Sequence, residues 1–190
     1  MSKTQDRHFR PGVMLFPFRK YLSGAQHNFV QAYVKEGMYV LDMGSGPGFF
    51  TTLLSKSVGS NGSVYAVDAD EVVIRHLKKQ ADMQGLTNIK AYASSAANIP
   101  FVRDGSIDVL FSNGLLCCMM DHKGAVREMI RVMKPDSKGF ISVAKVLRND
   151  GIGVTKKEWN EILGSFRTVK VGSSVMMDWA IVSKYSGDVA

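Results

Sequence analysis

The chain has 190 residues, of which 45% are hydrophobic and 22% are charged. These values are typical of one globular domain with a sizeable core, and the chain is too short for two domains of ordinary size. No run of 18 apolar residues occurs, and the N-terminus lacks the apolar core of a signal peptide, so we expect neither a membrane span nor secretion.

The formal net charge is +7, from 24 basic and 17 acidic residues. Such a charge is compatible with a nucleic-acid partner. The basic residues are scattered, however, and the densest group lies in the N-terminal segment at Arg7, Arg10, Arg19 and Lys20. Nucleic acid is therefore a possible partner, which we do not favour over a small molecule.

The two cysteines, Cys117 and Cys118, are adjacent in the sequence. Neighbouring cysteines rarely form a disulfide, and no C-x-x-C motif or histidine cluster suggests a metal site. We therefore expect no metal and a reducing, cytoplasmic compartment.

In chain order, short apolar runs alternate with amphipathic segments, which predicts βαβ units and a mostly parallel sheet. Residues 1–24 have no clear periodicity and are expected to form an arm or lid before a single domain of residues 25–190. Helices are predicted near residues 25–35, after Gly48, and near 70–84, 122–133 and 156–163, with Pro135 stopping the fourth. Strands are predicted near residues 39–42, 63–67, 89–93, 107–111, 139–146, 168–171 and 176–184.

The first strand runs into a turn with three alternating glycines, Gly44, Gly46 and Gly48. Glycine allows positive φ and lets a ligand lie against the backbone with no Cβ in the way. The dinucleotide-binding fingerprint is G-x-G-x-x-G. Phe49 stands where its third glycine would be, so that fingerprint is not met.

Two acidic residues stand at the ends of the predicted strands before and after this turn. Asp42 ends the first strand, and Asp68 ends the second, about twenty residues beyond the turn, which is the distance at which α/β folds hold a ribose. A carboxylate at position 42 would repel the phosphates of a dinucleotide, so it suits a cationic ligand better.

These residues resemble the motifs of the class I S-adenosylmethionine-dependent methyltransferases. The first family motif is an acidic residue followed by G-x-G-x-G, matched by Asp42, Gly44, Gly46 and Gly48, and the second is matched by Asp68. Residues 98–101 and 104–110 also resemble the branch that acts on small molecules. The resemblance covers roughly residues 30–146.

The resemblance implies a Rossmann-like, doubly wound α/β fold, with a mostly parallel seven-stranded sheet and an antiparallel C-terminal strand. It implies S-adenosylmethionine as the cofactor, with the glycine loop against its methionine part and Asp68 on its ribose hydroxyls. The implied cofactor-binding residues are Asp42, Gly44, Ser45, Gly46, Gly48, Asp68, Ala69, Ser95, Ala96 and Asn113.

One position departs from the family pattern. Many members have an acidic residue after the third strand that contacts the adenine amino group, and Ser95 stands at the matching position. A serine hydroxyl still accepts a hydrogen bond, and the backbone of Ala96 could donate to the ring. The adenine contact is therefore expected to differ.

Methyl transfer from a sulfonium requires alignment and exclusion of water more than acid–base chemistry, so we assign no catalytic residue. The acceptor is expected beyond the fourth strand, where Asn113 and His122 are weak candidates for contacting it. Asn113 is followed by Gly114 and Leu115. This disfavours the branch that methylates base amino groups or glutamine amides, which has a Pro-Pro pair there.

Three functions remain open on the sequence. The first is a methyltransferase acting on a small molecule, with RNA or protein as an alternative acceptor. The second is a nucleotide-dependent oxidoreductase, which Phe49 disfavours. The third is a non-catalytic module that binds the cofactor or a partner.

Overall fold

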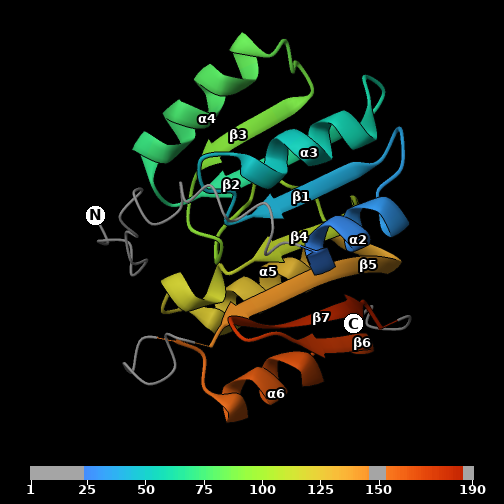
Figure 1. Ribbon diagram of the computed structural model, residues 1–190, viewed down its shortest axis with the longest axis vertical. Coiled ribbons are helices and arrows are strands. Elements are labelled where there is room, and N and C mark those ends of the chain that lie inside the picture. Colours follow the sequence, from blue (N-terminus) through green and yellow to red (C-terminus); the bar gives the residue numbers. More distant parts are fainter. Residues whose placement is uncertain (1–23, 146–152, 186–190) are drawn as a thin grey trace.

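A computed structural model describes residues 24–145 and 153–185 (Figure 1). The predicted arm of residues 1–24 lies outside this part of the chain, except for Gly24. One seven-stranded sheet, in the order β3-β2-β1-β4-β5-β7-β6, runs through the molecule. Its strands are β1 Tyr39–Met43, β2 Ser63–Asp68, β3 Ile89–Ala93, β4 Ile107–Asn113, β5 Met133–Ala144, β6 Arg167–Ser173 and β7 Met177–Ser183.

Helices cover both faces of this sheet, and in Figure 1 α2 and α3 lie in front of it and α5 behind. Buried side chains of α2 and α3 form one core cluster with β1, β2, β4 and β5, and α4 packs on the same face against β2 and β3. Side chains of α5 and α6 form the other cluster. The helices are α2 Gly24–Tyr33, α3 Phe49–Val58, α4 Glu71–Met83, α5 His122–Val132 and α6 Lys156–Gly164, with the short 3₁₀ helix η2 at Leu116–Cys118.

The direction of the strands confirms the predicted mixed sheet. Strands β1 to β5 pair in parallel, whereas β7 is antiparallel to both of its neighbours, β5 and β6. This is the doubly wound α/β architecture with one antiparallel strand near the C-terminus that the family resemblance implies. The strand order reverses between β1 and β4, and in open α/β sheets ligands bind at the carboxyl ends of the strands at such a point.

The start of β5 differs from the prediction. The strand was expected near residue 139, but it begins at Met133, directly after α5. Its pairing with β4 jumps from Ile107–Met133 to Val109–Lys138, so the intervening residues form a bulge in which Asp136 has a φ of 58°. Pro135 sits in this bulge, where its missing N–H disturbs no ladder hydrogen bond.

Candidate functional site

The glycine turn between β1 and α3 is closed in by neighbouring side chains. A Cβ on Gly44, whose φ is 85°, would lie 2.8 Å from the Cβ of Leu115, and one on Gly48, whose φ is 97°, would lie 2.2 Å from Leu77 Cδ1. Both the backbone conformation and the lack of space therefore require glycine. The turn is joined to β2 because the N–H groups of Gly44 and Ser45 donate to the carbonyl oxygen of Val67.

Asp68, at the end of β2, joins the turn to the next loop. Its Oδ2 accepts from the N–H of Gly46 at 2.9 Å, and its Oδ1 accepts from the N–H of Asp70 at 3.0 Å. The two backbone donors hold the carboxylate in one orientation.

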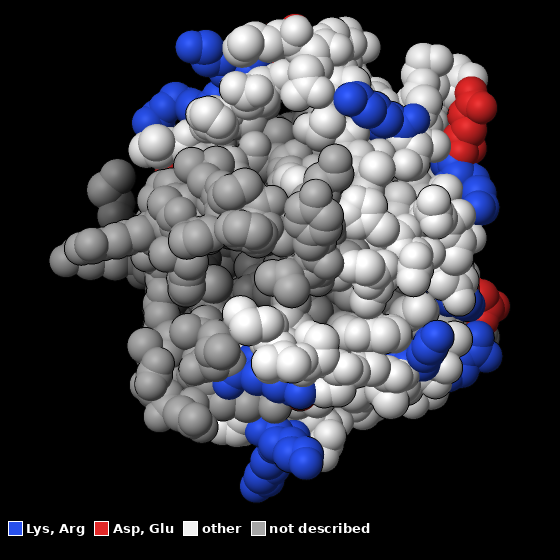
Figure 2. All heavy atoms as spheres, in the orientation of Figure 1, with Lys and Arg blue, Asp and Glu red and all other residues white. Residues whose placement is uncertain are grey.

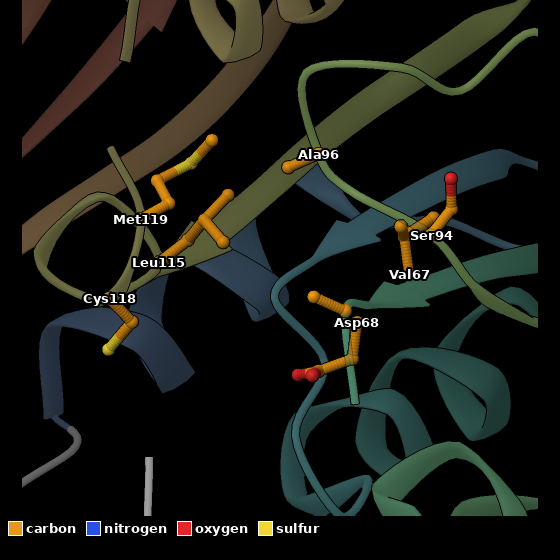
Figure 3. Close-up of a pocket in the computed structure, with 8 residues that line it drawn as sticks. Val67, Asp68, Ser94, Ala96, Leu115, Cys118 and Met119 are labelled. Atoms are coloured by element: carbon orange, nitrogen blue, oxygen red, sulfur yellow. The ribbon is translucent and has the colours of Figure 1, made fainter. Parts of the chain in front are cut away.

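A small cavity lies beside this carboxylate. It is lined by Val67, Asp68, Ala69, Ser94, Ala96, Leu115, Cys118 and Met119. Figure 3 shows Val67, Asp68 and Ser94 on one side and Leu115, Cys118 and Met119 on the facing side. A polar strand end therefore faces an apolar wall, which is the mixture typical of a small-molecule site.

Asp42 lies deeper than Asp68, with 2% of its surface exposed. Its Oδ2 accepts a 2.6 Å hydrogen bond from Thr51 Oγ1 on α3. A buried carboxylate needs such donors because desolvation is costly. Thr51 stands two residues into α3 and thus fixes the acidic end of β1 against the helix that follows the glycine turn.

The loop after β3, which follows directly on the last strand residue Ala93, contributes Ser94 and Ala96 to the cavity. Ser95, predicted from the family pattern, lies between them, and its Oγ accepts from the N–H of Ala97. Ser94 Oγ donates to the carbonyl oxygen of Asn98. The loop is thus held by its own serines, and Ser94 is a lining residue that the sequence did not identify.

Asn113, at the end of β4, takes part in a buried polar network. Its Oδ1 accepts from Gln26 Nε2 at 2.9 Å and from Ser142 Oγ at 2.8 Å. Gln26 is 5% exposed and comes from α2. The network thus connects α2 and β5 to the end of β4. Gln26 carries no motif, and nothing in the local sequence indicated this role.

His122 begins α5, and both of its ring nitrogens contact the protein. Nδ1 lies 2.5 Å from Glu158 Oε1 and Nε2 lies 3.0 Å from the carbonyl oxygen of Met119. Cys117 is buried, and its sulfur accepts from the N–H of Ala144. Of the two cysteines, Cys118 is the one that lines the cavity.

Within residues 24–145 and 153–185, no helix has the length and apolar character needed to cross a membrane. The same residues contain no group of three or more His, Cys, Asp or Glu side chains placed to hold a metal ion.

The glycine turn, the acidic end of the second strand and the cavity beside it thus lie together at the switch point of an α/β sheet. A family model described as a methyltransferase domain matches residues 34–165. The chain belongs to this family, and its recognition as a class I S-adenosylmethionine-dependent methyltransferase domain is confirmed.

Individual curated relatives of the chain are methyltransferases as well. Demethylmenaquinone methyltransferase from Geobacillus sp. (strain WCH70) is 27% identical over 132 residues, covering 70% of this chain and 56% of the relative. Arsenite methyltransferase from Aquipseudomonas alcaligenes is 33% identical over 114 residues, covering 56% of this chain and 33% of the relative. The chain thus spans about half or less of the length of these curated relatives.

A solved structure extends the similarity over nearly the whole fold. The SAM-dependent methyltransferase from Aquifex aeolicus superposes with a TM-score of 0.80 at 26% identity, covering 92% of this chain and 98% of that protein.

Proposed function

We propose that this chain transfers a methyl group from S-adenosylmethionine to a small-molecule acceptor. The observation that carries the proposal is Asp68. Its carboxylate is held by the N–H groups of Gly46 and Asp70 and lines a cavity at the switch point of the sheet. A fixed pair of carboxylate oxygens is suited to two neighbouring hydroxyls of a ribose.

The residues present fit the cofactor chemically. At Gly44 and Gly48 the space that a Cβ would take is filled by Leu115 and Leu77, so these two glycines let the turn pack closely next to the cavity. Asp42 provides negative charge near the end of β1, which favours a cationic ligand. Ala96 and Ser94 form the part of the wall next to β3, where the resemblance implies the adenine. When bound, the cofactor supplies an activated methyl group on a sulfonium.

The protein's own contribution is alignment and exclusion of water. Leu115, Cys118 and Met119 form an apolar wall opposite Asp68, and Met119 is 2% exposed. Such a wall keeps water from the reacting atoms and holds an acceptor by burial of apolar surface. We assign no general base, because the two nitrogens of His122 already contact Glu158 and Met119.

Among acceptors, we favour an apolar aromatic compound of the type that demethylmenaquinone represents in the relatives. The apolar wall supports this choice. Arsenite is less well suited, because As(III) binds up to three sulfur atoms. Cys117 is buried, and its sulfur accepts a hydrogen bond from the backbone N–H of Ala144. Cys117 and Cys118 are adjacent and so poorly placed to form a disulfide with each other, which also supports our proposal of a cytoplasmic compartment.

An RNA acceptor has less support. In the described part of the face shown in Figure 2, Lys and Arg side chains stand in separate groups and do not form one continuous patch. Nucleic-acid binding by phosphate contacts would favour a connected basic surface.

Isothermal titration calorimetry with S-adenosylmethionine tests the cofactor assignment. We expect binding by the wild type, and Asp68→Asn should weaken it by about 1.5–3 kcal/mol, the range for a hydrogen bond to a charged group. Asp82→Asn, on the exposed face of α4, is the matched control and should bind like the wild type. Absence of binding at millimolar ligand would reject the proposal.

A second assay separates catalysis from binding alone. Methyl transfer from labelled cofactor is measured with a panel of small phenols and quinols, with RNA as a further acceptor. Transfer to a panel compound supports the proposal. Cofactor binding without transfer to any acceptor would instead indicate a binding module, and transfer to RNA alone would replace the small-molecule acceptor.

A further inference from the structure

Gln26 of α2 reaches the end of β4, where it contacts the side chain of Asn113. Its Nε2 donates to Asn113 Oδ1 at 2.9 Å and to Met177 Sδ at 3.8 Å. Asn113 Oδ1 accepts a second hydrogen bond, at 2.8 Å, from Ser142 Oγ on β5. Gln26 is 5% exposed and Ser142 is fully buried, so water competes little for these contacts.

These contacts decide which way round the two amides lie. A thioether sulfur carries no hydrogen and can only accept, so the Gln26 atom that faces Met177 is the nitrogen and not the oxygen. The same nitrogen needs an acceptor on Asn113, which is Oδ1. The Ser142 hydroxyl donates to this oxygen as well. The Asn113 amide is therefore held with its Nδ2 group directed away from both donors.

The Nδ2 group of Asn113 can donate to a ligand. Within residues 24–145 and 153–185 it has no hydrogen-bond partner, in contrast to Oδ1. It is also not fully buried, because the fully buried side-chain polar atom without a partner in this part of the chain is Ser112 Oγ. An amide NH₂ group offers two donors and no acceptor. This position therefore suits a ligand oxygen that accepts hydrogen bonds and disfavours an ammonium group.

The position of Asn113 beside the glycine turn indicates which oxygen it meets. Strand β4 pairs in parallel with β1, and the register joins Asp42 to Phe111. Continued by two residues, this register brings Asn113 next to Gly44, which packs against Leu115 two residues further on. The amino-acid end of the cofactor is expected at this turn. It carries one carboxylate, which accepts hydrogen bonds, and one ammonium group, which only donates, so Asn113 suits the carboxylate.

We propose that Gln26 is a positioning residue that holds the Asn113 amide so that Nδ2 donates to the carboxylate of S-adenosylmethionine. Without the hydrogen bond from Gln26 the amide can turn over, and Oδ1 would then face the carboxylate and repel it. This inference rests on the proposed function. It adds that recognition of the amino-acid end of the cofactor depends on a residue of α2 that acts through Asn113.

Isothermal titration calorimetry with S-adenosylmethionine and with decarboxylated S-adenosylmethionine tests the contact. The second ligand lacks only the carboxylate, so it reports on the fold and on the rest of the site. Asn113→Asp keeps an oxygen for Gln26 and Ser142 but replaces the NH₂ group by a second oxygen. It should bind S-adenosylmethionine roughly 10- to 100-fold more weakly than the wild type, the range for a hydrogen bond to a charged group. The decarboxylated ligand should bind at least as tightly as to the wild type, because the new carboxylate attracts a cation.

Gln26→Met tests the positioning itself. Methionine has nearly the shape of glutamine but no N–H group, so the Asn113 amide is free to turn over. We expect the affinity for S-adenosylmethionine to fall by roughly 3- to 10-fold, with the affinity for the decarboxylated ligand unchanged. Gln31→Met, on the exposed face of the same helix, is the matched control and should bind both ligands like the wild type.

Equal weakening of both ligands by either variant would indicate a structural role and overturn the proposal. Unchanged binding of S-adenosylmethionine by either variant would overturn it as well. The Asp68→Asn titration separates this result from the proposed function. If Asp68→Asn weakens the cofactor while the variants at Gln26 and Asn113 do not discriminate between the two ligands, the positioning role alone is wrong. If the wild type binds neither ligand, the proposed function fails and this inference fails with it.

Discussion

At the scale of single residues, Gly48 shows how closely the turn is fitted to its surroundings. Its φ of 97° is unfavourable for any residue with a Cβ, and that Cβ would meet Leu77. We expect Gly48→Ala to lower the free energy of unfolding by about 1–3 kcal/mol, measured by urea denaturation. In α6, a Cβ added at Gly164 would meet no atom within 4 Å apart from the adjacent backbone. Gly164→Ala should therefore raise the free energy of unfolding by about 0.5–1 kcal/mol. Equal effects at both positions would contradict the structure.

Thr51 contributes to the orientation of Asp42. Thr51→Val keeps the shape of the side chain but removes the hydroxyl that donates to Asp42 Oδ2. The loss of a hydrogen bond to a buried carboxylate should cost about 1.5–3 kcal/mol in unfolding free energy. Thr51→Ser retains the hydroxyl and should recover most of this. If the serine variant is as unstable as the valine variant, the methyl group and not the hydroxyl matters.

At the scale of elements, α5 holds the connection between β3 and β4. Glu128 Oε2 accepts from the N–H of Ile99, and Arg131 donates to the carbonyl oxygens of Ile99 and Val102. Arg131 also pairs with Glu128 and with Asp104. This connection also contains Ser94 and Ala96, which line the cavity, so the network supports one of its walls.

The pair of Glu128 and Arg131 makes the free energy of unfolding depend on pH. The hydrogen bonds from Arg131 hold the pKa of Glu128 below its usual value, and the Arg131 pKa is raised, chiefly by Glu128. A carboxyl group with a lowered pKa stabilises the fold above its ordinary pKa, and this contribution is lost as the pH falls through the folded value. It should therefore be complete at pH 7, begin to decline near the ordinary pKa of 4.5 and be lost as the pH falls through the lower pKa of the folded state.

Glu128→Gln tests this by urea unfolding at pH 7 and pH 3.5. We expect the variant to be less stable than the wild type by about 1–2 kcal/mol at pH 7, with a much smaller difference at pH 3.5. Glu161→Gln, whose pair with Lys157 spans 4.0 Å on the exposed face of α6, should change stability little at either pH. A Glu128→Gln difference that is the same at both pH values would contradict the role of the charge.

At the scale of the whole molecule, the sequence predicted those features that are encoded locally. The glycine turn and Asp68 could be recognised because strand ends and turns follow from short-range spacing, and the mixed sheet followed from the family resemblance. The contact of Asn113 with Gln26 joins residues 87 apart, and that of His122 with Glu158 joins residues 36 apart. Such pairs leave no periodic signal, so they could not be predicted.

Two smaller differences have local causes. Periodicity does not fix which residue of an irregular loop faces a cavity, so Ser94, which lines it, could not be identified from the sequence. The fifth strand was expected to begin near residue 139, but it begins at Met133, and a bulge accommodates Pro135 within β5. The roles of the predicted cofactor-binding residues stay predictions until a ligand is observed.

A crystal structure with S-adenosylhomocysteine bound tests the central claim most directly, namely that a nucleoside occupies the edge formed by the ends of β1, β2 and β4. We predict density in the cavity, with both ribose hydroxyls within hydrogen-bond distance of Asp68 and the amino-acid end against the turn at Gly44 and Gly46. A ligand bound elsewhere, or a ribose held without the Asp68 carboxylate, would contradict the assignment.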